Sequence, residues 1–169
     1  MSDTPAEASL EPHRKAAARN RITATRIAPR SPDVADAVWL IVLQGDTGAP
    51  RQARHEIAER LNGELGSERR KDALLLTGEL VANSVVHAGG EVAREILLEL
   101  VIDPEVVRVV VTDTGSTLVP KLRQRSATLE SGRGLLLVEQ LSDRWGMMRD
   151  GTRRTRVWFE ILREPPEPT

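Results

Sequence analysis

The sequence of 169 residues contains no cysteine and no tyrosine, and aromatic side chains make up only 2% of it. The absence of cysteine excludes disulfides, thiolate metal sites and a cysteine nucleophile. With three tryptophans and one phenylalanine, an aromatic platform on which nucleic-acid bases stack is not expected. A packed core must therefore consist mainly of Leu, Val, Ile and Ala, which the hydrophobic content of 40% permits.

The sequence also lacks a strong charge of one sign and a long hydrophobic run. Its formal net charge is −1, so there is no global positive field to attract nucleic acid. No apolar run approaches the roughly 18 residues of a membrane span, and the N-terminus has no apolar signal-peptide core. We therefore expect a soluble, cytoplasmic protein that binds neither nucleic acid nor a membrane directly.

Composition divides the chain into three parts. Residues 1–34 contain several prolines, basic side chains and few large apolar ones, which predicts a disordered tail, with a docking arm for an acidic partner as the alternative. Residues 35–163 predict one folded domain, because single domains commonly contain about 100–150 residues. Residues 164–169 contain three prolines and predict a frayed C-terminus.

Hydrophobic periodicity and turn residues predict the elements of this domain. Helices are expected at 51–61, 67–88 and 134–141, and an irregular stretch at 114–131. Strands are expected at 38–43, 93–102, 106–112, 144–149 and 155–162. This order predicts an α/β (α+β) two-layer sandwich, in which helices cover one face of a mixed β-sheet.

The second predicted helix carries Glu79, Asn83 and His87 at four-residue spacing. These residues lie on one helix face, because positions four apart are neighbours on a helix surface. A polar stripe of this kind ordinarily faces water. For His87, interaction with the exposed carbonyls of the helix end remains an equal alternative.

Two glycine-containing segments follow. Asp113 ends a predicted strand and is followed by Gly115, so a carboxylate stands beside a backbone that a ligand can approach closely. Gly132 and Gly134 begin an apolar helix, where free backbone N–H groups and the helix dipole favour phosphate. Each pattern alone is common, since the first also forms ordinary turns and the second also starts ordinary helices.

Taken together, these segments resemble the gyrase/histidine-kinase (GHKL) ATPase superfamily. Residues 79–87 (ELVANSVVH) resemble its N box, 113–115 (DTG) its G1 box and 132–135 (GRGL) its G2 box. Residues 141–146 (LSDRWG) and 155–160 (TRVWFE) are similar to the stand-alone bacterial anti-sigma-factor serine kinases. The resemblance covers about residues 38–162 and implies a Bergerat-type fold that binds ATP and Mg²⁺.

The resemblance also implies roles for single residues. Asn83 would be the Mg²⁺ ligand and Glu79 the general base. Asp113 would accept a hydrogen bond from the adenine amine, and Gly115 would let the base lie close. The other implied ATP contacts are His87, Gly132, Arg133, Gly134 and Leu135 around the phosphates, and Thr155 near the adenine.

For the whole chain, the resemblance implies an ATP-dependent serine/threonine protein kinase that phosphorylates an anti-sigma-factor antagonist. It also implies a sigma factor as a partner and a homodimer built partly from the first helix. A non-catalytic ATP-binding module that regulates transcription by sequestering its partner remains the alternative, and the intact Glu79 and Asn83 favour the kinase. A two-component histidine kinase is disfavoured, because no separate dimerisation helix carries a phosphoacceptor histidine.

Overall fold

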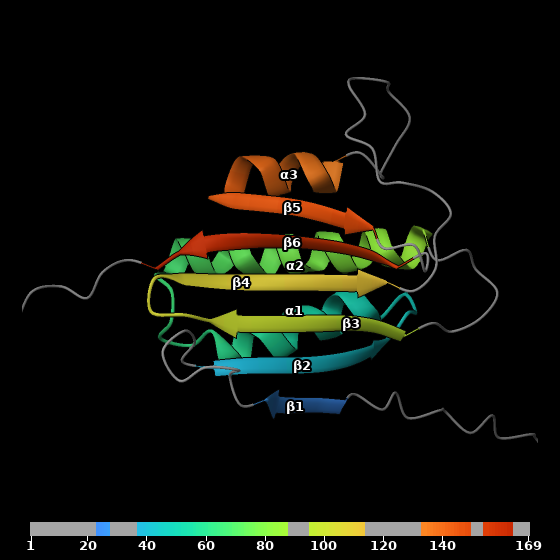
Figure 1. Ribbon diagram of the computed structural model, residues 1–169, viewed down its shortest axis with the longest axis horizontal. Helices are drawn as coiled ribbons and strands as arrows, with labels where there is room; N and C mark the ends of the chain where they lie inside the picture. The colour runs from blue at the N-terminus through green and yellow to red at the C-terminus, as the bar shows by residue number, and fades with distance from the viewer. Residues whose placement is uncertain (1–22, 28–36, 88–94, 114–132, 150–153, 164–169) are drawn as a thin grey trace, which may run out of the picture.

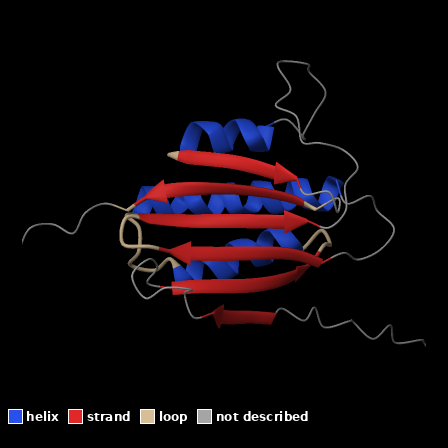
Figure 2. Cartoon of the chain, in the orientation of Figure 1, coloured by secondary structure: helices blue, strands red, loops and turns tan. Residues whose placement is uncertain are grey.

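The computed structural model describes residues 23–27, 37–87, 95–113, 133–149 and 154–163. These residues form one six-stranded sheet, with the two longer helices on one of its faces and the short third helix beside one edge of the sheet, packed against the second helix (Figure 1, Figure 2). From one edge of the sheet to the other, the strands are β1 (Thr23–Ile27), β2 (Ala37–Gln44), β3 (Glu95–Ile102), β4 (Val106–Asp113), β6 (Thr155–Leu162) and β5 (Arg144–Arg149). The predicted two-layer α/β sandwich is therefore confirmed.

Every predicted helix and strand is found, with ends shifted by a few residues. The helices are α1 (Ala49–Arg60), α2 (Ser67–His87) and α3 (Arg133–Leu141). The stretch expected to be irregular, 114–131, lies outside the described residues.

Strand β1 lies in the segment that the sequence predicts as a disordered tail. It pairs antiparallel with β2, from Thr23 opposite Val42 to Ile27 opposite Val38. The guanidinium of Arg26 lies 5.5 Å from the ring centre of Trp39, which adds a cation–π contact. The tail prediction is thus wrong for these five residues, because pairing with a neighbouring strand stabilises a short segment whose own strand signal is weak. Residues 1–22, 28–34 and 164–169 lie outside the described residues.

The sheet was expected to be mixed, but all five strand pairs among the described residues are antiparallel. Two helices, rather than one, connect β2 with β3. A single helix would bring the chain back to the end of the sheet where β2 begins, and β3 would then run parallel to β2. The pair α1 and α2 brings the chain back to the end where β2 finishes, so β3 runs antiparallel to β2. Strand β5 runs in the same direction as β4, but the two do not pair with each other, because β6 lies between them.

Helices α1 and α2 form a hairpin whose ends follow from local sequence. Pro50 stands in the first turn of α1, where its missing N–H has no helical partner to lose. Gly63 has a φ of 83° in the connection, a left-handed conformation that glycine adopts without steric cost. The two helices are also joined by Arg70, which donates a hydrogen bond of 2.7 Å to the carbonyl oxygen of Ala58.

The core lies between the helices and one face of the sheet. Alternate residues of β3 are buried, as the two-residue period of a strand requires. Phe159 on β6 is among the largest fully buried side chains. The α2 side of the core includes Leu76, Leu80 and Val81.

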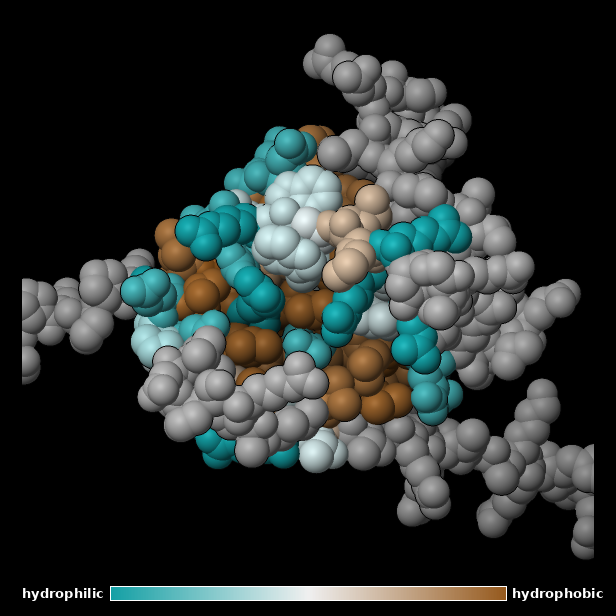
Figure 3. Space-filling model, in the orientation of Figure 1, coloured by the Kyte–Doolittle hydropathy of each residue, from teal (hydrophilic) through white to brown (hydrophobic). Residues whose placement is uncertain are grey.

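The opposite face of the sheet carries no helix among the described elements, and Figure 1 looks onto it. Hydrophobic and hydrophilic side chains are interspersed there (Figure 3). We call it the open face. Among the helices described, none combines the length and the apolar character needed to cross a bilayer.

Candidate functional site

Helix α2 directs the two main candidate residues away from the sheet. Its buried hydroxyl groups, Thr77 and Ser84, donate to the carbonyls of Ala73 and Leu80, so they are satisfied within the helix. Glu79 and Asn83 lie on the other side of α2 and are only half-buried. Both side chains therefore remain partly exposed to solvent.

Gly134, in the first turn of α3, lies directly against these two side chains. A Cβ atom at this position would stand 2.6 Å from Asn83 Nδ2 and 3.3 Å from Glu79 Oε2. The first of these separations is shorter than carbon and nitrogen tolerate, so only glycine fits without displacing Asn83. The N box and the G2 box of the sequence, about fifty residues apart, thus meet in space.

Asp113 and Thr155 form a second pair, on the strands β4 and β6. They are directly opposite each other in the antiparallel register. Both are buried on the helix-covered face, with Asp113 7% and Thr155 2% exposed. Among the described residues, Thr155 Oγ1 has no hydrogen-bond partner although it is buried. A buried hydroxyl without a partner is costly, so this one is suited to a ligand or a bound water.

The two pairs lie at the same end of the molecule. The C-terminal end of β4, the start of β6, the second half of α2 and the start of α3 are all at the right of Figure 1. Helix α2 also packs against α3, β4 and β6. The fold therefore brings the predicted adenine contacts and the predicted metal and base residues to one region.

These residues fit ATP with Mg²⁺. The Asp113 carboxylate can accept an N–H donor, the Thr155 hydroxyl has no partner within the described part of the chain, and the start of α3 is kept free of side-chain bulk at Gly134. No group of three His, Asp or Glu side chains able to hold a metal ion occurs among the residues described. Mg²⁺ bound through Asn83 would therefore take most of its oxygen ligands from phosphates and water, as is usual for this ion.

Several predicted contacts are only partly described. Gly115 and Gly132 lie outside the described residues. His87 is the last residue of α2 and Arg133 the first of α3, but their side chains lie outside the described part. Leu135 is buried in the core, so only its backbone is available to a ligand. The roles of all these residues remain predictions.

A close contact between α1 and α2 lies next to Glu79 in the sequence and outside the motifs. Arg54 of α1 lies across Gly78, where an added Cβ would stand 3.1 Å from Arg54 Cδ. Glycine in the middle of a helix costs about 1 kcal/mol relative to alanine, so Gly78 needs a packing reason. An isolated glycine within an otherwise helical pattern is the kind of signal that points to such a contact.

Comparison with known proteins concerns the fold and the family of this chain. No curated protein sequence matches the chain. The crystal structure of the RsbU and RsbW domains of Rv1364c from Mycobacterium tuberculosis is similar, with a TM-score of 0.54 and 22% identity. The match covers 78% of this chain but 34% of that one, and at this identity it concerns the fold alone. The model of the histidine kinase-like ATPase domain matches residues 44–161. The chain therefore belongs to the histidine kinase-like ATPase domain family, which is a family of ATP-binding domains.

Proposed function

We propose that this chain is an ATP-dependent serine/threonine protein kinase that phosphorylates an anti-sigma-factor antagonist and also binds a sigma factor. The observation that carries the proposal is the contact of Gly134 with both Glu79 and Asn83. It brings a carboxylate, an amide and a helix N-terminus together, which are the groups that phosphoryl transfer requires. The motif resemblance to anti-sigma-factor kinases supports the choice of partner.

Each residue has a distinct role in this proposal. Bound ATP with Mg²⁺ supplies the phosphoryl group and neutralises its charge. Asn83 holds the metal through its amide oxygen, and the N–H groups at the start of α3 orient the phosphates. Glu79 accepts the proton of the incoming hydroxyl. Asp113 and Thr155 hold the adenine at the strand ends.

The surroundings of Glu79 favour a protein as the substrate. Leu75 stands one turn before it and Val86 two turns after it on the same side of α2, and they are 41% and 69% exposed. Large apolar side chains around a candidate base leave water only when a second surface covers them. A protein substrate whose hydroxyl is surrounded by an apolar surface would cover these side chains.

The proposal is tested by direct transfer. Purified protein, radiolabelled ATP and Mg²⁺ are incubated with each small antagonist protein encoded in the same genome. We expect one of them to become labelled on a serine or threonine, as identified by mass spectrometry of the product. Absence of label on every such protein would contradict the kinase proposal.

Replacement of the proposed metal ligand should weaken binding of ATP with Mg²⁺. For Asn83→Ala we expect a loss of roughly 1–3 kcal/mol, the scale of one charge-assisted contact. Calorimetry with Mg²⁺ and with EDTA measures it. In EDTA, the variant and the wild type should bind ATP almost equally. The same affinity in all four experiments would remove Asn83 from the metal site.

Replacement of the proposed adenine acceptor should reduce base selectivity. Asp113→Asn substitutes an N–H donor for one acceptor oxygen, so ATP affinity should decrease and the preference for ATP over GTP should become smaller. Competition of both nucleotides against a fluorescent ATP analogue measures this preference. A wild type that binds GTP as tightly as ATP would contradict the assignment.

Replacement of the apolar neighbour of Glu79 should affect the protein substrate selectively. For Leu75→Gln we expect KM for the antagonist to rise about ten- to hundredfold, because burial of a leucine contributes about 1.5–3 kcal/mol, while ATP affinity stays unchanged. Leu162→Gln is the matched control, since Leu162 is 47% exposed but lies at the far end of β6 from Thr155. Equal KM values in both variants would exclude Leu75 from the docking surface.

A further inference from the structure

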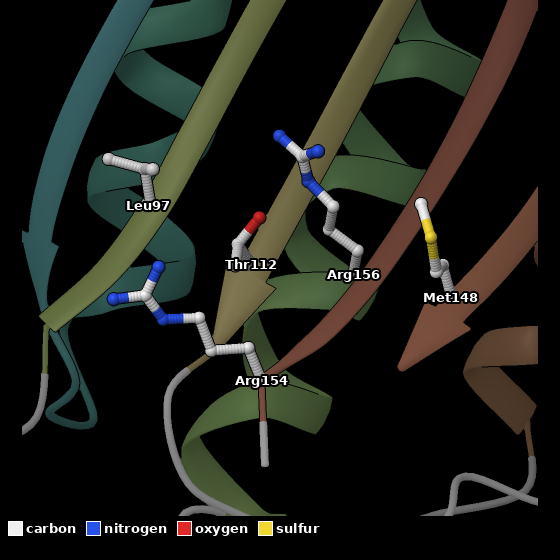
Figure 4. Close-up of a pocket in the computed structure, with 5 residues that line it drawn as sticks. All are labelled: Leu97, Thr112, Met148, Arg154 and Arg156. Carbon is white, nitrogen blue, oxygen red and sulfur yellow. The ribbon is translucent and has the colours of Figure 1, made fainter. Parts of the chain in front are cut away.

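A cavity of about 350 Å³ lies on the open face of the sheet (Figure 4). Its lining residues come from four strands and the residue before β6: Leu97, Thr112, Met148, Arg154 and Arg156. Four of them form one row across the sheet, in which Leu97 pairs with Thr112, Thr112 with Arg156 and Arg156 with Met148. None of them belongs to the candidate ATP site.

The cavity lies directly behind the proposed adenine contacts. Successive side chains of a strand point to opposite faces. Thr112 precedes Asp113 on β4, and Arg154 and Arg156 flank Thr155. The same two strand ends therefore present adenine contacts to the helix side and cavity residues to the open face.

The chemistry of the cavity is that of an anion site with apolar sides. Arg154 and Arg156 are two residues apart, so both cations are on one face of the chain, and their charges repel. The hydroxyl of Thr112 lies between the two guanidinium groups in Figure 4. Leu97 and Met148 stand at either end of the row. An anion that carries an apolar group would neutralise the two cations and also contact the apolar side chains of Leu97 and Met148.

Comparison with a second arginine of the open face shows that Arg156 retains binding capacity. Arg108 donates from Nε and Nη2 to the buried Glu160, so its guanidinium is engaged. Arg156 instead lies 3.8 Å from Glu99 through Nη2, a separation too long for a hydrogen bond. The Arg156 side chain is also 47% exposed. Its planar fork is therefore accessible to a carboxylate or phosphate, which it can bind through two hydrogen bonds.

We propose that this cavity binds a small organic anion, with a carboxylate or phosphate held by Arg154, Arg156 and Thr112 and an apolar group placed against Leu97 and Met148. The volume suits a small molecule, because ligand pockets commonly measure about 300–1,000 Å³. Binding of an anion in the cavity also changes the affinity for ATP, because Thr155, a proposed adenine contact, stands between Arg154 and Arg156 in the sequence. This coupling rests on the proposed adenine site, whereas anion binding itself does not.

The binding test uses three probes: phenyl phosphate, benzoate and inorganic phosphate. Calorimetry on the full chain, saturated with a non-hydrolysable ATP analogue and Mg²⁺, measures their affinities. We expect phenyl phosphate or benzoate to bind the wild type, and Arg156→Gln to weaken that binding at least tenfold. Inorganic phosphate separates the contribution of the charge from that of the apolar group. If phosphate alone binds as tightly as phenyl phosphate, the apolar part of the proposal is wrong.

Two further variants make the result specific. Arg144→Gln is the matched control, because Arg144 is an exposed arginine of the open face outside the cavity, and it should bind the probes like the wild type. Thr112→Val keeps the shape of the side chain and should weaken binding severalfold. The proposed site would be overturned if Arg144→Gln weakened probe binding as much as the cavity variants do, or if both cavity variants bound the probes like the wild type. It would also be overturned if no probe bound the wild type at millimolar concentration.

Coupling is measured separately, as ATP affinity with and without the probe that binds best. We expect a change of a few fold in the wild type and none in Arg156→Gln. By linkage, the probe affinity must change by the same factor when ATP is added. Probe binding with no change in ATP affinity would overturn the coupling and leave the anion site. Failure of ATP binding in the absence of any probe would instead count against the adenine site.

Discussion

Glu79→Gln is expected to lower phosphoryl transfer to the antagonist protein by about 10²–10⁴-fold, the usual contribution of a general base. The substitution preserves the shape of the side chain and its place beside Gly134, but the amide cannot accept the hydroxyl proton. ATP affinity should change only a few fold, because a carboxylate near phosphates repels them and does not hold them. Binding and chemistry should therefore separate at this residue.

The measurement is single-turnover transfer from radiolabelled ATP, with ATP affinity determined by calorimetry on the same preparations. Glu68→Gln is the matched control, since Glu68 is an exposed glutamate at the start of the same helix and pairs only with Lys71 among the described residues. It should transfer at the wild-type rate. Equal transfer by Glu79→Gln would indicate a kinase whose base lies elsewhere. ATP binding without transfer by the wild type would favour the non-catalytic module that sequesters its partner.

Phe159→Ala is expected to lower the free energy of unfolding by about 3–5 kcal/mol, the range for truncation of a buried aromatic side chain. Phe159 is the only phenylalanine of the chain and is fully buried on β6, opposite Val109 of β4 and Trp145 of β5. Its removal leaves a cavity that the surrounding core residues cannot close completely. A loss of this size is a large fraction of the stability of a typical domain, about 5–15 kcal/mol.

Denaturant unfolding followed by tryptophan fluorescence measures this loss. Leu162→Ala is the control on the same strand, because Leu162 is exposed and should change stability by no more than about 0.5–1 kcal/mol. If both variants unfolded at the same denaturant concentration, the packing of β6 against the helices would have to be revised.

Local sequence was sufficient to predict most of the elements and the candidate residues. Alternating hydrophobic residues and turn signals predict β2 to β6, and helical spacing predicts α1, α2 and α3. The spacing of Glu79 and Asn83 also predicts that they share a helix face. These features depend on residues within a few positions of each other in the chain, so they can be predicted from the sequence directly.

Interactions between distant segments required the tertiary structure. Strand β1 has a weak signal of its own and depends on pairing with β2. The antiparallel direction of β3 follows from the way that α1 and α2 pack, and the mixed sheet predicted from the element order is therefore wrong.

The arrangement of the site was likewise decided by packing. Motif order predicts that Asn83 and Gly134 serve one ligand, but only the docking of α3 beside α2 places them in contact. The alternation of β6 predicts that Arg154 and Arg156 share a face. The cavity between them exists because β3, β4 and β5 bring Leu97, Thr112 and Met148 alongside. The sequence by itself determined the elements and the residue types of the sites, because these depend on local preference. The tertiary structure alone decided which of them meet, because register and helix docking depend on how the whole core is filled.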